Sequence, residues 1–268
     1  MRPKANGKLK VGIAMTGFIA LLMIASFFYT PYDPYAMSMD LADKLQLPSS
    51  AHWLGTDNFG RDILSRLMAG IKHTMLTAAS TVAISLTIGV FLGFVAGYIG
   101  KAVDEAIMRL MDAISAFPGI LLALVLVAVL KQGPQAIILA LSILFVPSFT
   151  RISRGGLLQL KSADFVKSAE VFGASRLRII FFHMLPNIYP TLLSSIVLGL
   201  SNAIMSESSM SYLGLGLQPP IPSWGRMLGE AQAVLLIAPW YAAVTGLAIV
   251  FCVMGLNLLG EGIREMLP

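Results

Sequence analysis

Long charge-free apolar runs alternate with polar segments along the chain. Six of these runs are long enough to cross a membrane, and they lie at 11–32, 73–100, 113–130, 132–150, 179–206 and 231–260. A bilayer core is about 30 Å thick and takes about 20 apolar residues per helix, so each run predicts one membrane-spanning helix. The pattern predicts an all-α polytopic membrane protein with six transmembrane helices.

A seventh charge-free stretch, 208–225, is rich in residues that interrupt helices. It contains two glycines and three prolines, namely Gly214, Gly216, Pro219, Pro220 and Pro222. Irregular backbone is tolerated at membrane depth only where protein or a water-filled cavity surrounds it. We therefore expect a loop or a re-entrant turn here rather than a seventh spanning helix.

Four basic residues precede the first apolar run, namely Arg2, Lys4, Lys8 and Lys10. Basic residues in this position are typical of a membrane anchor and also of a cleavable signal peptide. The run is longer than the usual apolar core of a signal peptide, and no small-x-small cleavage pattern follows it. We expect a cytoplasmic N-terminus at 1–10 and a first transmembrane helix at 11–30.

Composition agrees with a membrane protein. Hydrophobic residues make up 56% of the 268 residues and charged residues only 12%. A soluble protein carries a larger share of charged residues, so this composition argues against a soluble two-domain protein. The formal charge of +5 indicates no nucleic-acid partner, because the basic residues concentrate in segments between the apolar runs. The one cysteine, Cys252, lies within an apolar run, so no intrachain disulfide can form.

The distribution of Lys and Arg predicts the orientation, because cytoplasmic loops carry the excess of basic residues. Residues 151–178 hold six basic side chains against two acidic ones, which places this segment inside. Residues 31–70 hold three basic side chains against five aspartates, so we expect an extracytoplasmic loop there. Alternation places both termini inside. The remaining residues, 71–268, then form a core of five transmembrane helices.

The cytoplasmic segment contains two short helical patterns joined by a glycine. Phe165, Ala169 and Phe172 lie on one helical face at i, i+4 and i+7. Gly173 is suited to the left-handed conformation that ends a helix, and Ser175 is suited to cap the next one. The pattern is compatible with a solvated helix on the lipid headgroups and with a docking element for a soluble partner.

A second apolar stripe follows, with a Leu-Pro pair at its end. Ile180, Phe181, Met184 and Leu185 recur at helical spacing, and we expect Pro186 to break the helix before the fifth transmembrane run.

The segment from 151 to 187 resembles the EAA loop of permeases of ATP-binding cassette (ABC) importers. That loop has Glu-Ala-Ala, a glycine four residues after the second Ala, and Leu-Pro about thirteen residues further on. This sequence has Ala169, Gly173 and the Leu185-Pro186 pair at the matching places. Lys167 and Ser168 stand where the loop has Glu and Ala. The match therefore rests on the spacing of the helix-glycine-helix pattern rather than on the charge of the triplet.

Four further stretches resemble one branch, the dipeptide, oligopeptide and nickel permeases, and specifically the second of their two permease subunits. They are HWLGTDNFGRDILSRLMAG at 52–70, VDEAIMRLMDAISAFPG at 103–119, SESSMSYLGLGLQPPIPSWGRML at 206–228 and GLAIVFCVMGLNLLGEGIRE at 246–265. With the EAA-like loop they occur in the expected order and are distributed along the chain from 52 to 265.

The resemblance implies a subunit in the inner membrane of a prokaryote that works by alternating access and needs no cofactor. Its implied partners are a homologous permease subunit, two cytoplasmic ATPase subunits and an extracytoplasmic solute-binding protein. The implied coupling helix, which would enter a groove on an ATPase, lies between the fourth and fifth transmembrane helices. The resemblance assigns the ATPase-coupling role to nine residues of this sequence: Phe165, Lys167, Ala169, Glu170, Phe172, Gly173, Ala174, Ser175 and Arg176.

Polar residues in the apolar runs are candidates for a translocation path. Glu207 stands at the end of a long uncharged run, where an acid at membrane depth costs about 2.5 to 3.5 kcal/mol on insertion scales. We take Asn202, Glu207 and Ser208 as path candidates. For Glu207, a position at the outer headgroups is an equal alternative, and Asn202 is suited to hydrogen bonding between helices.

Two charged clusters and a glycine series have structural interpretations. Asp57, Arg61 and Asp62 are expected to form a salt-bridge network within the outer loop rather than to bind substrate. Asp104, Arg109 and Asp112 are expected to pair with one another, and Glu105 is expected to pair with Arg109 at i, i+4. Gly89, Gly93 and Gly97 form a small-xxx-small face that suits packing within this chain or with a second chain.

The sequence contains no motif for catalysis. It has no G-x-x-x-x-G-K-[ST] phosphate loop, no H-E-x-x-H and no G-x-S-x-G, so ATP hydrolysis is expected in partner subunits. The three histidines are far apart in sequence, which predicts no metal site. Two other classes stay open at this point, an ion-coupled secondary transporter and a membrane assembly subunit that transports nothing. The cargo, di- or oligopeptide, nickel or a metal chelate, is also undecided.

Overall fold

The computed structural model describes residues 7–130 and 133–266, and these are almost entirely helical. Within these residues, five stretches of helix are long and apolar enough to cross a membrane. They are α1 (Gly7–Phe28), α2 (Ile63–Ile99), α5 (Pro134–Lys161), α8 (Leu185–Tyr212) with the turns that precede it, and α10 (Pro239–Met266). They confirm a spanning helix in each of five predicted runs, 11–32, 73–100, 132–150, 179–206 and 231–260, but the bounds differ: α2 begins ten residues before its run, and α10 begins at Pro239, after α9 and a turn. Of the predicted cytoplasmic N-terminus, 1–10, residues 1–6 lie outside the described part of the chain, and residues 7–10 belong to α1.

The third apolar run differs from the prediction of one helix over 113–130. It is divided between α3 (Lys101–Ala116) and α4 (Gly119–Leu130), whose axes are bent by 92°. Phe117 adopts an extended conformation (φ −82°, ψ 140°), because the residue before a proline is sterically driven out of the helical region. Pro118 thus ends one helix and starts another. Among the described residues, five of the six predicted spans are single helices, and the remaining one falls on the bent pair of α3 and α4.

The helix at the start of the fifth run continues through the Leu-Pro pair, so the prediction that Pro186 breaks it is wrong. A π-helical segment, η2 (Ile179–Met184), leads directly into α8. Pro186 is the second residue of α8, where the hydrogen bonding changes from the π pattern, in which the Leu185 amide donates to the Ile180 carbonyl, to the α pattern. Met184 is buried and Phe181 is exposed, which divides the predicted apolar stripe.

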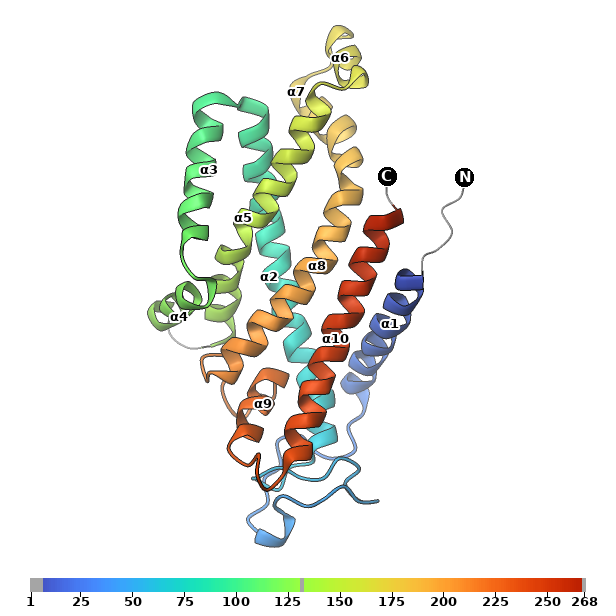
Figure 1. Cartoon of the computed structure of the whole chain (residues 1–268), viewed down its shortest axis with the longest axis vertical. Helices are drawn as coiled ribbons and strands as arrows, with labels where there is room; N and C mark the ends of the chain where they lie inside the picture. Colours follow the sequence, from blue (N-terminus) through green and yellow to red (C-terminus); the bar gives the residue numbers. More distant parts are fainter. Residues whose placement is uncertain (1–6, 131–132, 267–268) are drawn as a thin grey trace.

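The ends of the long helices define two ends of the molecule. The start of α1, the end of α10 and the short helices α6 (Asp164–Val171) and α7 (Arg176–Arg178) lie toward one end (Figure 1). The loop that holds η1 (Leu41–Asp43) lies at the other (Figure 1). Lys8 joins the ends of α1 and α10 through ion pairs to Glu261 at 3.0 Å and Glu265 at 2.8 Å. This arrangement agrees with the orientation predicted from the basic residues.

The glycine face of α2 packs against α5 of the same chain. A Cβ atom on Gly93 would lie 2.6 Å from the carbonyl oxygen of Thr150, and one on Gly89 would lie 2.6 Å from Cβ of Phe149. Only a hydrogen atom fits between these backbones. The structure thus assigns the small-residue face to packing within the chain, one of the two alternatives that the sequence left open.

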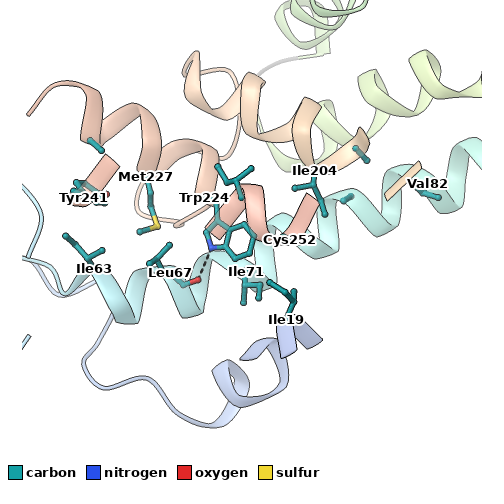
Figure 2. Packing of buried hydrophobic residues seen from close by; sticks show 14 of the residues in the cluster. Ile19, Ile63, Leu67, Ile71, Val82, Ile204, Trp224, Met227, Tyr241 and Cys252 are labelled. Atoms are coloured by element: carbon teal, nitrogen blue, oxygen red, sulfur yellow. Dashed lines mark hydrogen bonds between the residues drawn. The ribbon is translucent and has the colours of Figure 1, made fainter. Parts of the chain in front are cut away.

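Helix α9 (Trp224–Gln232) lies toward the end of the bundle that holds the loop with η1 (Figure 1). Its first residue, Trp224, is buried among side chains of α2, α8 and α10, and its indole nitrogen donates a hydrogen bond of 3.0 Å to the carbonyl of Leu67 (Figure 2). The loop before α9 contains the prolines of the seventh charge-free stretch, as predicted.

Candidate functional site

The coupling segment forms an elbow that stands beyond the long helices. We define the elbow as residues 164–178, which comprise α6, Gly173 and α7. Val166 is buried and anchors α6 to an apolar cluster formed with residues of α2, α5 and α8. Phe172 exposes 89% of its side chain and Val171 exposes 84%. One face of the elbow is therefore fixed to the bundle, and another presents apolar groups outward.

Gly173 gives the elbow its shape. Its φ of +78° lies in the left-handed region, which a glycine adopts without strain. The Ala174 amide donates to the Ala169 carbonyl and the Gly173 amide donates to the Glu170 carbonyl, each at 3.0 Å. This pair of hydrogen bonds is the Schellman motif that ends a helix. Ser175 then caps α7 by accepting a hydrogen bond from an amide.

The structure brings together all nine residues to which the resemblance gives a coupling role. Seven of them are exposed, namely Phe165, Lys167, Glu170, Phe172, Gly173, Ser175 and Arg176. Ala169 and Ala174 are half-buried and pack toward the bundle, so they support the elbow. Lys167 lies 3.7 Å from Asp164 in a fully exposed pair, which leaves its charge accessible. The elbow offers apolar anchors with charged residues around them.

The three path candidates are not gathered in one place. Glu207 and Ser208 are buried, whereas Asn202 is exposed on the same helix. One carboxylate oxygen of Glu207 accepts a 2.6 Å hydrogen bond from Ser211, and the other has no partner among the described residues. Protein on α2, α8 and α9 encloses this carboxylate, so it does not lie at an exposed headgroup position. A role in the path remains a prediction for these residues.

A cavity of about 420 Å³ lies beside this region, and sequence reasoning did not find it. It is lined by α3, α4, α5 and α8 where the 92° bend turns α4 away from α3. Its walls are mainly apolar and include Ser115, Phe117, Ile120, Phe145, Ser206 and Met210. Ser206 places the cavity one residue from Glu207. The Pro118-Gly119 pair was the sequence signal that could have indicated the bend.

The outer charged cluster contains the predicted pair of Asp57 and Arg61, but Asp62 does not pair with Arg61, and the network extends beyond the loop. Nε of Arg61 lies 2.7 Å from Oδ2 of Asp57, and Nη2 of Arg61 lies 2.8 Å from Oε2 of Glu230 in α9. Arg66 in α2 binds the same glutamate oxygen at 3.0 Å. Asp62 caps α2 and contacts His52 at 2.9 Å. The network thus fixes α9 to the start of α2, a long-range contact that local spacing could not predict.

The inner charged cluster differs from its prediction. Glu105 and Arg109 pair at 2.6 Å as expected, but Asp104 and Asp112 do not pair with Arg109. Asp104 binds Arg154 with two hydrogen bonds, and Asp112 binds Arg151 at 2.8 Å. These pairs join α3 to α5, because the chain turn after α2 brings the two helices together. Among the described residues, no group of three His, Cys, Asp or Glu side chains is arranged to hold a metal.

The bundle, with its buried polar residues and its exposed elbow at one end, has the architecture of a membrane transport subunit. Comparison with known families agrees with this class. Residues 89–268 match the family described as "Binding-protein-dependent transport system inner membrane component".

Two curated relatives cover nearly the whole chain. The glutathione transport system permease protein GsiD of Pectobacterium atrosepticum is 41% identical over 94% of this chain and 84% of its own length. The dipeptide transport system permease protein DppC of Alkalihalophilus pseudofirmus is 37% identical over 98% of this chain and 86% of its own length.

A solved structure, titled as an inward-facing conformation of the MetNI methionine ABC transporter, has the same fold. The TM-score is 0.63 at 16% identity, and the match covers 74% of this chain and 94% of that one. The chain belongs to the family of binding-protein-dependent inner membrane transport components. It is a multi-pass permease subunit of an ABC importer in the bacterial inner membrane.

Proposed function

We propose that this subunit imports short peptides, as one half of a heterodimeric permease. The names of the relatives, which refer to dipeptide and glutathione transport, support a peptide cargo. Nickel and metal chelates, which the sequence also allowed, find no support in those names. The homologous second permease, two cytoplasmic ATPases and an extracytoplasmic binding protein are the partners that we propose.

The elbow carries the mechanical part of the proposal. Its exposed apolar residues lie at the end of the molecule that the basic residues place in the cytoplasm. An apolar anchor that enters a pocket on a partner contributes most of the binding energy at such a surface, and surrounding charges set orientation more than affinity. We propose that ATP-driven closure of the ATPases moves the elbow and that the helices joined to it, α5 and α8, follow.

The cavity at the bend between α3 and α4 supports a location for the path. α4, α5 and α8 contribute its wall, and α8 continues from the elbow through η2. A movement of the elbow is therefore transmitted along α8 to Ser206 at the cavity and to its neighbour Glu207. We propose that Asn202, Glu207 and Ser208 respond to this movement as α8 alternates between two positions.

The test of coupling is the substitution Gly173→Pro in the importer reconstituted in liposomes. Proline fixes φ near −65°, which is incompatible with the +78° of this position, so the elbow cannot form. We expect normal membrane insertion, ATP hydrolysis that no longer responds to peptide and binding protein, and loss of peptide uptake. Gly173→Ala is the matched control, because its Cβ meets no atom within 4 Å and only the strain of the left-handed conformation is added.

Undiminished uptake by Gly173→Pro would contradict the coupling role. Uptake that collapses with an ion gradient, but survives removal of ATP, would contradict the whole proposal and favour a secondary transporter. A subunit with no transport phenotype when deleted would favour an assembly role.

A further inference from the structure

An apolar groove of about 550 Å³ lies between α2 and α8 in the half of the bundle nearest the elbow. Its walls consist of aliphatic and aromatic side chains, among them Val90, Phe91, Phe94, Phe181, Tyr189 and Leu192. Phe91, Phe181 and Tyr189 expose more than half of their side chains, so the groove opens to the outside of this chain.

A second pocket, of about 310 Å³, adjoins the groove on its cytoplasmic side. The two share Tyr98 and Ile99 in their walls, but the second is lined by charged residues as well. Lys161 and Arg176 contribute two positive charges to it and Glu170 contributes one negative charge. The apolar groove thus ends at a pocket with a net positive charge.

Lys161 and Arg176, the two cationic side chains of the pocket, differ in their contacts within the protein. Nζ of Lys161 donates to the carbonyl oxygens of Tyr98 at 3.2 Å and Gly97 at 3.4 Å, at the end of α2. These contacts hold the ammonium group at the mouth of the groove and leave donor capacity for an anion. Arg176 forms no ion pair within residues 7–130 and 133–266.

We propose that the groove and the pocket together bind one anionic phospholipid of the cytoplasmic leaflet. The acyl chains would lie along Phe91, Phe94 and Tyr189, and the phosphate would lie between Lys161 and Arg176. The charge of the pocket favours this occupant, since basic residues beside an apolar groove on the cytoplasmic side bind acidic headgroups. Tyr98, which lines both the groove and the pocket, adds an aromatic ring with a hydroxyl group where the acyl-chain part meets the phosphate part.

The position of the site connects lipid to coupling. Arg176 belongs to α7 of the elbow, Lys161 ends α5, and Tyr98 lies in the last turn of α2. A phosphate held by these side chains would join three elements that otherwise meet mainly through the apolar cluster around Val166. The bound lipid would therefore brace the elbow against the bundle.

The experiment measures lipid retained by the full-length subunit in its purified complex, by native mass spectrometry with added phosphatidylglycerol or phosphatidylcholine. We expect phosphatidylglycerol to be retained preferentially and Lys161→Gln to weaken its retention about fivefold, as the loss of one basic residue near an acidic headgroup predicts. Lys161→Arg should restore retention. Lys10→Gln removes the same charge from an exposed position on α1, outside the groove, the pocket and the elbow, and should leave retention unchanged.

A photo-reactive benzoylphenylalanine in place of Tyr189 identifies what covers the groove. Recovery of a phospholipid adduct supports the proposal. An adduct with the second permease subunit instead would overturn it, because the groove would then be a protein interface. Equal retention of the two lipids, or equal losses in Lys161→Gln and Lys10→Gln, would also overturn it. Each readout is lipid binding, so its result does not depend on whether peptides are the cargo.

Discussion

Phe172 is a large apolar side chain that is almost fully exposed at the tip of a short helix. Its 89% exposure would be ordinary in contact with lipid, but α6 extends beyond the long helices at the end that the basic residues predict to be cytoplasmic. In that position the ring contacts water until a partner covers it. An aromatic side chain that is buried at the centre of an interface commonly contributes 2 kcal/mol or more to binding.

The substitution Phe172→Ala tests this residue as an anchor. We expect the affinity for the ATPase subunits to fall by about 2 kcal/mol, or roughly 30-fold, because the partner pocket loses its occupant. The measurement is a titration of ATPase onto the permease in nanodiscs. Phe28→Ala is the control, because Phe28 is exposed to a similar extent, 86%, at the opposite end of the molecule. Equal affinities for the two variants would show that Phe172 is not the anchor.

Individual ion pairs were the part of the structure least accessible to sequence reasoning. The i, i+4 pair of Glu105 and Arg109 follows from helix geometry and was predicted correctly. The partner of Asp104 is Arg154, fifty positions away, and the partner of Arg61 includes Glu230. Only the packing of helices decides such pairs, and spacing along one helix contains no information about it.

At the scale of elements, the contact between α2 and α5 depends on missing side chains. A Cβ on Gly93 would meet Oγ of Ser153 and two backbone atoms of α5 at less than 3.0 Å. One of these, the carbonyl oxygen of Thr150, cannot move without the helix that carries it. The two helices are therefore closer here than any other residue at position 93 permits.

We expect Gly93→Ala to lower the stability of the folded subunit by about 1 to 3 kcal/mol, the usual cost of overpacking a close interface. A lower apparent melting temperature in detergent, followed by loss of the monodisperse peak on size exclusion, would measure it. Gly246→Ala in α10 is the matched control, because its Cβ would meet nothing within 4 Å. If both variants melt at the wild-type temperature, the close approach of α2 and α5 is not as tight as described.

The sequence predicted which segments form spanning helices, but it predicted poorly where those helices bend. Long apolar runs identify spanning helices because lipid demands about 20 apolar residues in each. The same rule counted 113–130 as one helix, although Pro118 within it dictates an extended residue before it. In contrast, Pro186 was expected to end a helix and instead lies two residues after a π-helical segment, inside a helix that continues through it. The effect of a proline depends on its position in the helix.

At the scale of the whole molecule, the elbow and the loop around η1 lie at opposite ends. The basic residues predict which end is cytoplasmic, and the positions of the helix ends agree. The exposed helix-glycine-helix elbow could therefore be anticipated from spacing, a family resemblance and charge, whereas its coupling role remains a proposal. The cavity beside the α3–α4 bend could not, because it arises from four helices that come from separate parts of the chain.

Accessibility of single cysteines measures this orientation. Cys252 is buried and is the chain's one cysteine, so Cys252→Ala provides a background without thiols. We expect Met39→Cys, at a position that is 95% exposed in the outer loop, to react with an impermeant maleimide in right-side-out vesicles. Glu105→Cys, on α3, should react only in inverted vesicles. The reverse pattern would show that the orientation drawn from the charges is wrong.

The π-helical turns between the elbow and α8 have a consequence for direction. A π-helix accommodates about one more residue than an α-helix over the same length, and each residue of an α-helix advances the azimuth by about 100°. The six residues from Ile179 to Met184 thus set the angle at which Phe172 faces away from the axis of α8. A homologue with one residue fewer in this segment would present its elbow about a quarter of a turn away. The length of the π-helical segment therefore determines the direction in which the elbow faces its docking partner, whichever side chains the elbow carries.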